Sequence, residues 1–78
     1  MTIENIKAQK IYINSEPTEL YKILKFEGMV STGGEAKTVI ANGLVYVNNQ
    51  LEFQKRKKIM SGDTIHFHDR SYVIFLAK

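Results

Sequence analysis

The short length of the chain is the feature that most constrains its fold. Seventy-eight residues leave room for one hydrophobic core, and a chain of this size buries only roughly 60–65% of its unfolded surface on folding. A deep catalytic cleft is difficult to build on so small a core, which favours a binding module over an enzyme. The hydrophobic and charged fractions, 44% and 24%, are typical of a folded globular domain. We therefore expect a single domain over residues 1–78.

The composition also excludes several kinds of site. The chain contains no cysteine, which excludes disulfides, thiolate metal sites and cysteine nucleophiles. Its longest apolar runs, such as residues 43–47, are too short to span a bilayer. The first five residues include an acid and no apolar core, so we expect no signal peptide. These features predict a cytoplasmic protein without a membrane partner.

Positive charge is concentrated in the second half of the chain. Residues 1–39 contain five lysines and five glutamates, which cancel, whereas residues 40–78 contain six basic and three acidic residues. The difference accounts for the whole net charge of +3. Four of the six basic residues are consecutive. Such a cluster favours a polyanion as partner, although a solvated loop has the same composition.

A first short helix is predicted near the start of the chain. Its apolar residues follow helical spacing: Leu20, Ile23 and Leu24. Residues 15–18 offer a helix start with a proline and hydroxyl side chains, and Gly28 is a natural stop. We place this helix at about residues 17–27, with Lys22 and Lys25 outside the apolar stripe.

A second helix is predicted at about residues 33–42. Its inward stripe is Ala36, Val39 and Ile40. Thr32 and Glu35, three residues apart, form a capping box at its start, and Gly43 ends it in the left-handed conformation that glycine allows. A helix of about two turns is not stable alone, so we expect it to pack on the first helix.

The remaining segments predict β structure. Two-residue alternation marks strands near residues 10–14, 45–47, 64–68 and 72–76, and Leu51 with Phe53 indicates a return strand after a turn at residues 48–49. Further turns are predicted at residues 61–63 and 69–71. The predicted fold class is α+β, with two short helices packed on a small, mostly antiparallel sheet.

The glycine-rich start of the second helix is a candidate anion site. Thr32, Gly33 and Gly34 would let a phosphate approach the helix amides, and Lys37 lies one turn further on, opposite the apolar stripe. A plain capped turn has the same sequence, and Glu35 competes for the same amides. The Gly-Lys-Ser/Thr ending of a nucleotide-hydrolase phosphate loop is absent.

The basic run is a second candidate. It consists of Lys55, Arg56, Lys57 and Lys58. In an extended segment Lys55 and Lys57 would point one way and Arg56 and Lys58 the other, so two or three of them could contact one phosphate backbone. We expect Lys37, Arg56 and Lys58 to share one surface with the glycine-rich turn, and rank Lys22 and Lys25 as secondary candidates.

Two histidines could be read as metal ligands. His66 and His68 would lie on one face of a strand, but a zinc site needs at least a third protein ligand, and Asp69 would point elsewhere. No nucleophile motif surrounds Ser31 or Asp63. We therefore expect no metal, no cofactor, no small-molecule substrate and no catalytic activity.

The order of these segments is distinctive. Leucines at 20 and 24 precede Gly28; the next segment begins Thr32-Gly33-Gly34-Glu35-Ala36-Lys37; Gly43 is followed by Val45-Tyr46-Val47-Asn48-Asn49, and Gly62-Asp63-Thr64-Ile65 closes the pattern. This arrangement resembles the S4 RNA-binding domain family, and most closely its small stand-alone bacterial members. The resemblance covers a core motif of about residues 17–68. It implies the S4-like fold, or alpha-L motif.

The resemblance also implies a function. S4 domains bind structured RNA, usually ribosomal or transfer RNA, through the two-helix unit and the following hairpin, so RNA and a ribosomal subunit are the expected partners. Gly33 departs from the family, since many members have arginine there. The alternative interpretation is a small ubiquitin-like interaction or sulfur-carrier module, which would need a Gly-Gly end where this chain has Ala77-Lys78.

Overall fold

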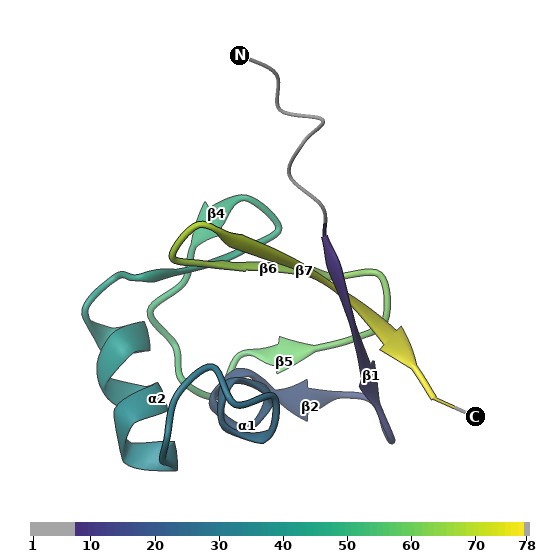
Figure 1. Cartoon of the computed structure of the whole chain (residues 1–78), viewed down its shortest axis with the longest axis horizontal. Helices are drawn as coiled ribbons and strands as arrows, with labels where there is room; N and C mark the ends of the chain where they lie inside the picture. The colour runs from purple at the N-terminus through teal and green to yellow at the C-terminus, as the bar shows by residue number, and fades with distance from the viewer. Residues whose placement is uncertain (1–7, 78) are drawn as a thin grey trace.

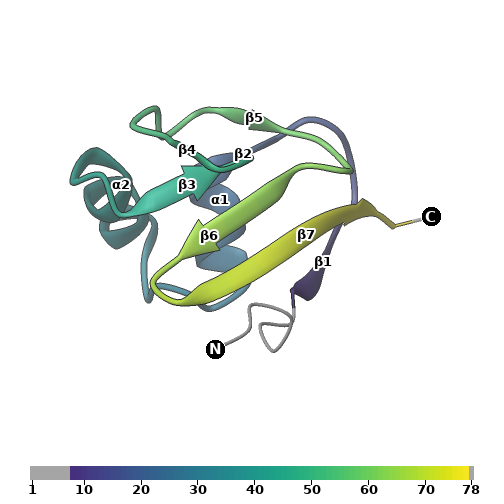
Figure 2. The same ribbon diagram turned by 90° about the horizontal axis from the view of Figure 1, so that it is seen from above.

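Both helices of the described chain pack against the same face of a five-stranded sheet (Figure 1). The computed structural model describes residues 8–77. Helix α1 is Leu20–Phe26 and helix α2 is Gly33–Ala41. Figure 2 looks onto the sheet with α1 behind it and α2 beside the start of β3, and the outer face of the sheet carries neither helix.

The main sheet has the strand order β1-β7-β6-β3-β4. Its strands are β1 (Gln9–Ile13), β3 (Val45–Val47), β4 (Gln50–Leu51), β6 (Thr64–Phe67) and β7 (Arg70–Leu76). All neighbours are antiparallel except β1 and β7, which run parallel. Strands β2 (Thr18–Glu19) and β5 (Lys58–Ile59) form a separate antiparallel pair. The prediction of two short helices on a mostly antiparallel sheet is confirmed.

Alternating side chains of the sheet and the apolar stripes of the helices form one core. Leu20, Leu24 and Ile40 are fully buried from the helix side, and Ile65 and Ile74 from the sheet side. The period-two and helical spacings read from the sequence therefore select the buried faces correctly. No helix in residues 8–77 is long and apolar enough to cross a membrane.

The second helix begins and ends close to its predicted limits. The Thr32 hydroxyl accepts a hydrogen bond from the Glu35 N–H at 3.0 Å, as a capping residue should. In a capping box the Glu35 carboxylate would accept a hydrogen bond from the N–H of Thr32. Here it accepts instead from the N–H of Ser31, at 2.9 Å. Gly43 follows with a φ of +75°.

The first helix begins later than predicted. Residues 17–19 were expected in its first turn, but Thr18 and Glu19 form β2 and pair with Ile59 and Lys58. Glu19 stands at the N-cap without a side-chain capping bond. Pairing with a segment forty residues away overrides the local start signal.

Two turns of the sheet test the turn predictions. Asn48 and Asn49 have positive φ, 52° and 69°, and connect β3 to β4 as predicted. The turn between β6 and β7 falls at residues 68–69, one residue earlier than predicted, with His68 at a φ of 59°. His68 therefore leaves the strand that carries His66.

Candidate nucleic-acid interface

The segment from Glu52 to Lys57 is a loop held by hydrogen bonds, not an extended strand. β4 ends at Leu51, so the predicted return strand does not reach Phe53. The Glu52 N–H donates to the Val45 carbonyl at 2.9 Å, the Gln54 N–H to the Glu52 carboxylate at 3.1 Å, and the Lys57 N–H to the Gln54 carbonyl at 3.1 Å. The last bond closes a turn with Lys55 and Arg56 at its tip. The predicted alternation of the basic run is wrong, because a turn breaks the two-residue period.

The same loop supplies the missing cap of α1. The N–H groups of Leu20 and Tyr21, in the first turn, donate to the carbonyls of Lys57 and Lys55 at 2.9 and 3.0 Å. These donors have no partner within a helix. The basic loop is thus bonded to the start of α1 through its backbone, which leaves the side chains of Lys55 and Arg56 exposed.

Helix α2 brings Lys37 to the same place. The Lys37 side chain is half-buried, and its Nζ lies 4.9 Å from the centre of the Tyr21 ring. Its position opposite the apolar stripe predicts that this lysine projects outward, but it lies across the neighbouring helix, where the ring attracts the cation. Gly33 lies beside it: a Cβ there would be 4.0 Å from both the Lys25 Cδ and the Tyr21 Cδ2.

Three cations line one shallow hollow, which we call the cationic depression. It has a volume of about 580 Å³ and is lined by Lys37, Thr38, Ala41, Phe53, Gln54, Lys55 and Arg56. No acidic side chain is among these lining residues. Uncompensated cations attract and hold phosphate, and arginine can bind it through two parallel N–H donors.

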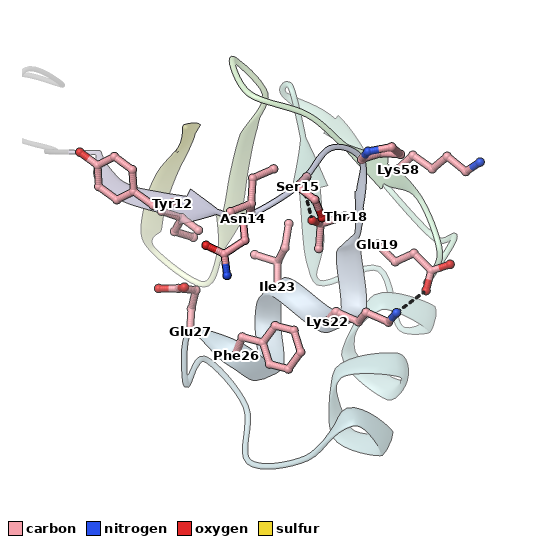
Figure 3. Close-up of a pocket in the computed structure, with 13 residues that line it drawn as sticks. Tyr12, Asn14, Ser15, Thr18, Glu19, Lys22, Ile23, Phe26, Glu27 and Lys58 are labelled. Atoms are coloured by element: carbon pink, nitrogen blue, oxygen red, sulfur yellow. Dashed lines mark hydrogen bonds and ion pairs between the residues drawn. The ribbon is translucent and has the colours of Figure 1, made fainter. Parts of the chain in front are cut away.

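Two of the predicted lysines, Lys22 and Lys58, lie elsewhere. Lys22 and Lys58 line a groove between β1 and α1, which we call the β1–α1 groove, with a volume of about 670 Å³ (Figure 3). Glu19 and Glu27 line the same groove, and the Lys22 Nζ is 3.7 Å from the Glu19 Oε1. The expected grouping of Lys58 with Lys37 and Arg56 is therefore wrong. Lys58 belongs to β5 and faces the other hollow.

The other predicted residues support the cationic depression or border it. Lys25 is exposed and close to Gly33, and Lys57 contributes its backbone carbonyl to the start of α1. Thr32 acts as the helix cap, and Gly34 follows Gly33 in the first turn of α2. Tyr21 and Phe53 were not predicted as part of the site. An aromatic residue two positions before a basic run was the only signal for Phe53.

The two histidines are not arranged as metal ligands. The Nδ1 of His66 is 2.9 Å from the Ser71 hydroxyl, in a pair that crosses from β6 to β7. The His68 ring packs against Phe67, with ring centres 4.1 Å apart. Within residues 8–77 no group of three histidine or acidic side chains could hold an ion.

One carboxyl outside the lining of the cationic depression, that of Glu16, has a shifted pKa. Hydrogen bonds from Ser61, first from its side chain and then from its backbone N–H, lower the pKa of Glu16 below its ordinary value. The backbone N–H lies 2.8 Å from the Glu16 Oε2. This contact ties the segment after β1 to the turn before β6.

Comparison with known sequences identifies the fold family. A family model described as S4 domain matches residues 11–75. The chain belongs to the S4 domain family. The family match of this S4 domain includes residues 11–13 of β1, both helices and nearly all of β7.

Two sequence relatives of this S4 domain carry the name YbcJ. They are the "Putative RNA-binding protein YbcJ" of Escherichia coli (strain K12) and the "Uncharacterized protein YbcJ" of Shigella flexneri. Each is 43% identical over 53 residues, which cover 68% of this chain and 76% of the relative.

A solved structure is similar along nearly the whole chain. The solution structure of YbcJ from E. coli, described as revealing an αL motif involved in RNA binding, superimposes with a TM-score of 0.67 at 33% identity. The match covers 99% of this chain and 98% of that one. The predicted S4-like fold with its alpha-L motif is confirmed.

Proposed function

We propose that this S4 domain binds structured RNA through the cationic depression. The observation that carries the proposal is the convergence of Lys37, Lys55 and Arg56 on one hollow whose lining includes no acid. The aliphatic part of Lys25 lies close to Gly33 at the start of α2, and its Nζ is 5.9 Å from the centre of the Phe26 ring. The proposed role is binding alone, with no catalytic step.

The shape of the surface suits the phosphate backbone of folded RNA. The grooves of A-form helices hide most base edges, so proteins recognise them largely by shape and phosphate position. The cations come from α2 and from a loop bonded to α1, so hydrogen bonds and helix packing position the backbone that carries them. Cations from two separate segments can contact two stretches of phosphate on one folded RNA.

The relatives support this proposal. A YbcJ protein with 43% identity carries RNA binding in its name, and the similar solution structure is described by a motif involved in RNA binding. The family match to residues 11–75 also favours an S4 protein over the alternative ubiquitin-like or sulfur-carrier module.

Within this class we propose ribosomal or transfer RNA as the ligand, a ribosomal subunit as a candidate partner and the cytoplasm as the location. No small molecule or membrane is included among the partners. The resemblance to S4 domains supports this choice of RNA and partner, whereas the lining of the cationic depression supports phosphate binding.

Titration of purified protein with ribosomal RNA and transfer RNA over a range of salt concentrations tests the proposal. If four to six phosphate contacts form, log affinity should fall with log salt at a slope of roughly −3 to −5. The variant Lys37→Ala/Arg56→Ala should bind both RNAs more weakly and flatten the slope by roughly 2. Affinity that does not depend on salt, or that the double variant leaves unchanged, would contradict phosphate binding at this surface.

A further inference from the structure

Phe53 is a large apolar side chain exposed among cations. Its side chain is 56% exposed, and it lines the cationic depression together with Lys37, Lys55 and Arg56. Exposed aromatic rings beside cations are the usual elements of a surface that stacks nucleic-acid bases. Phosphate binding alone does not require this ring.

The Phe53 ring is held in place from one side. A Cβ on Gly43 would lie 3.2 Å from the Phe53 Cε1 and 3.6 Å from its Cζ, so the ring rests closely on the backbone of the glycine. The same imagined atom would lie 3.8 Å from the Leu51 Cδ2. Gly43, with its φ of +75°, therefore both ends α2 and makes room for the ring.

The backbone on both sides of Phe53 is also fixed. Glu52 donates its N–H to Val45, and the Gln54 N–H is bonded to the Glu52 carboxylate. A ring positioned by its own backbone and by Gly43 loses little conformational freedom when a base stacks on it. The site is therefore organised before any ligand arrives.

We propose that Phe53 is a stacking subsite for one unpaired nucleotide. The proposal rests on the function above and makes it more specific: the preferred RNA carries a bulged, looped or terminal base beside its helical stretch. The base would stack on the exposed side of Phe53, and its neighbouring phosphates would meet Lys55 and Arg56. The Gln54 side chain lines the same hollow and offers both a donor and an acceptor to a base edge.

A second exposed ring provides the matched control. Phe26 is 68% exposed, more than Phe53, but it lines the β1–α1 groove, where Glu19 and Glu27 oppose Lys22 and Lys58. Exposure alone would favour Phe26 as the stacking ring. The cations around Phe53, without a lining acid, favour Phe53.

The test uses two RNA hairpins that differ only in one bulged 2-aminopurine nucleotide in the stem. Stacking on an aromatic side chain is worth enough to change affinity by roughly 5- to 100-fold. Wild-type protein should bind the bulged hairpin at least about fivefold more tightly than the paired one and should change the 2-aminopurine fluorescence. Phe53→Leu should lose this preference while its affinity for the paired hairpin stays the same. Phe53→Tyr and Phe26→Leu should both keep the preference.

The outcomes separate the subsite from the underlying function. Equal, salt-dependent affinity of wild-type protein for both hairpins would overturn the stacking subsite and leave phosphate binding intact. A preference that survives in Phe53→Leu, or that is lost in Phe26→Leu, would also overturn it. Absence of binding to either hairpin would overturn both proposals. Unchanged affinity of Phe53→Leu for the paired hairpin excludes a folding defect of that variant, and Phe53→Tyr tests whether an aromatic ring at this position is sufficient.

Discussion

The cationic depression and the β1–α1 groove differ more in the balance of charges that line them than in their volume. The groove is the larger, about 670 Å³ against 580 Å³, yet its two lysines face two glutamates. The cationic depression has three cations and no lining acid. A phosphate entering the groove would meet carboxylates that repel it and a lysine already paired with Glu19.

The two regions also differ in how the chain assembles them. The groove is built mostly from neighbouring parts of the sequence, residues 11–27, with Lys58 from a distant strand. The cationic depression joins α2 to residues 53–56. The bonds from Leu20 and Tyr21 join the basic loop to α1, and α2 packs on α1. Interactions among backbone groups therefore position the side chains that we propose bind RNA.

Neutralising two cations in each hollow gives the largest expected contrast. Lys55→Gln/Arg56→Gln should weaken RNA binding by at least about 100-fold, because each contact between a charged side chain and a phosphate contributes about 1.5–3 kcal/mol and two such contacts are lost. Lys22→Gln/Lys58→Gln removes the same charge and should weaken binding less than about threefold, since these lysines are balanced by acids. The measurement is titration of both variants at one salt concentration. Equal losses would mean that net charge alone controls binding.

Removing the ring under Lys37 should have an intermediate effect. Tyr21→Leu deletes the aromatic face 4.9 Å from the ammonium group, an attraction of about 0.5–2 kcal/mol, and leaves Lys37 free to move. We expect RNA affinity to fall by about three- to tenfold. Tyr12→Leu, in the β1–α1 groove, is the control and should bind as wild type does. Unchanged affinity in Tyr21→Leu would show that the position of Lys37 is unimportant.

Removing a helix cap should affect stability without changing the interface directly. The Thr32 hydroxyl accepts a bond from the Glu35 N–H, and Thr32→Ala should lower the free energy of unfolding by about 1 kcal/mol. Thr18→Ala removes a hydroxyl at the start of β2 that donates to the Ser15 carbonyl and should cost less. Urea denaturation measures both. Equal costs would contradict the capping role.

The smallest effect concerns pH. Hydrogen bonds from Ser61 hold the pKa of Glu16 below its ordinary value, so the ionised form stabilises the folded state. This contribution is complete above the unfolded glutamate pKa, about 4.3, and is lost as the pH falls through the lower folded value. Glu16→Gln should therefore be slightly less stable than wild type near neutral pH, and the difference should shrink in acid. A constant difference in thermal midpoint across this range would exclude the linkage.

Short-range patterns predicted much of the fold from the sequence. Leu20, Leu24 and Ile40 follow helical spacing and are buried, and Asn48-Asn49 forms the turn it predicts. The late start of α1 could not be predicted, because it depends on pairing between Thr18–Glu19 and Lys58–Ile59. Helix-start residues in the local sequence give no information about a strand partner about forty residues away.

The candidate site was less predictable than the fold. The cationic character of residues 55–58 was evident, but the turn closed by Lys57 and Gln54 decides which side chains share a surface. That turn places Lys55 with Arg56 and sends Lys58 to the opposite hollow. Backbone hydrogen bonds of this kind cannot be predicted from the types of side chain in the loop. The close packing of the Phe53 ring on Gly43 cannot be predicted from them either.

The most direct test of the central claim is to map RNA contacts on the protein by NMR. A titration of ¹⁵N-labelled protein with ribosomal RNA fragments follows every backbone amide and compares the two hollows within one molecule. We predict the largest chemical-shift changes at Lys37, Thr38 and residues 53–56, with little change at Asn14, Ser15 and Glu27. Changes concentrated along the β1–α1 groove, with residues 53–56 unaffected, would contradict the assignment of the cationic depression as the RNA interface.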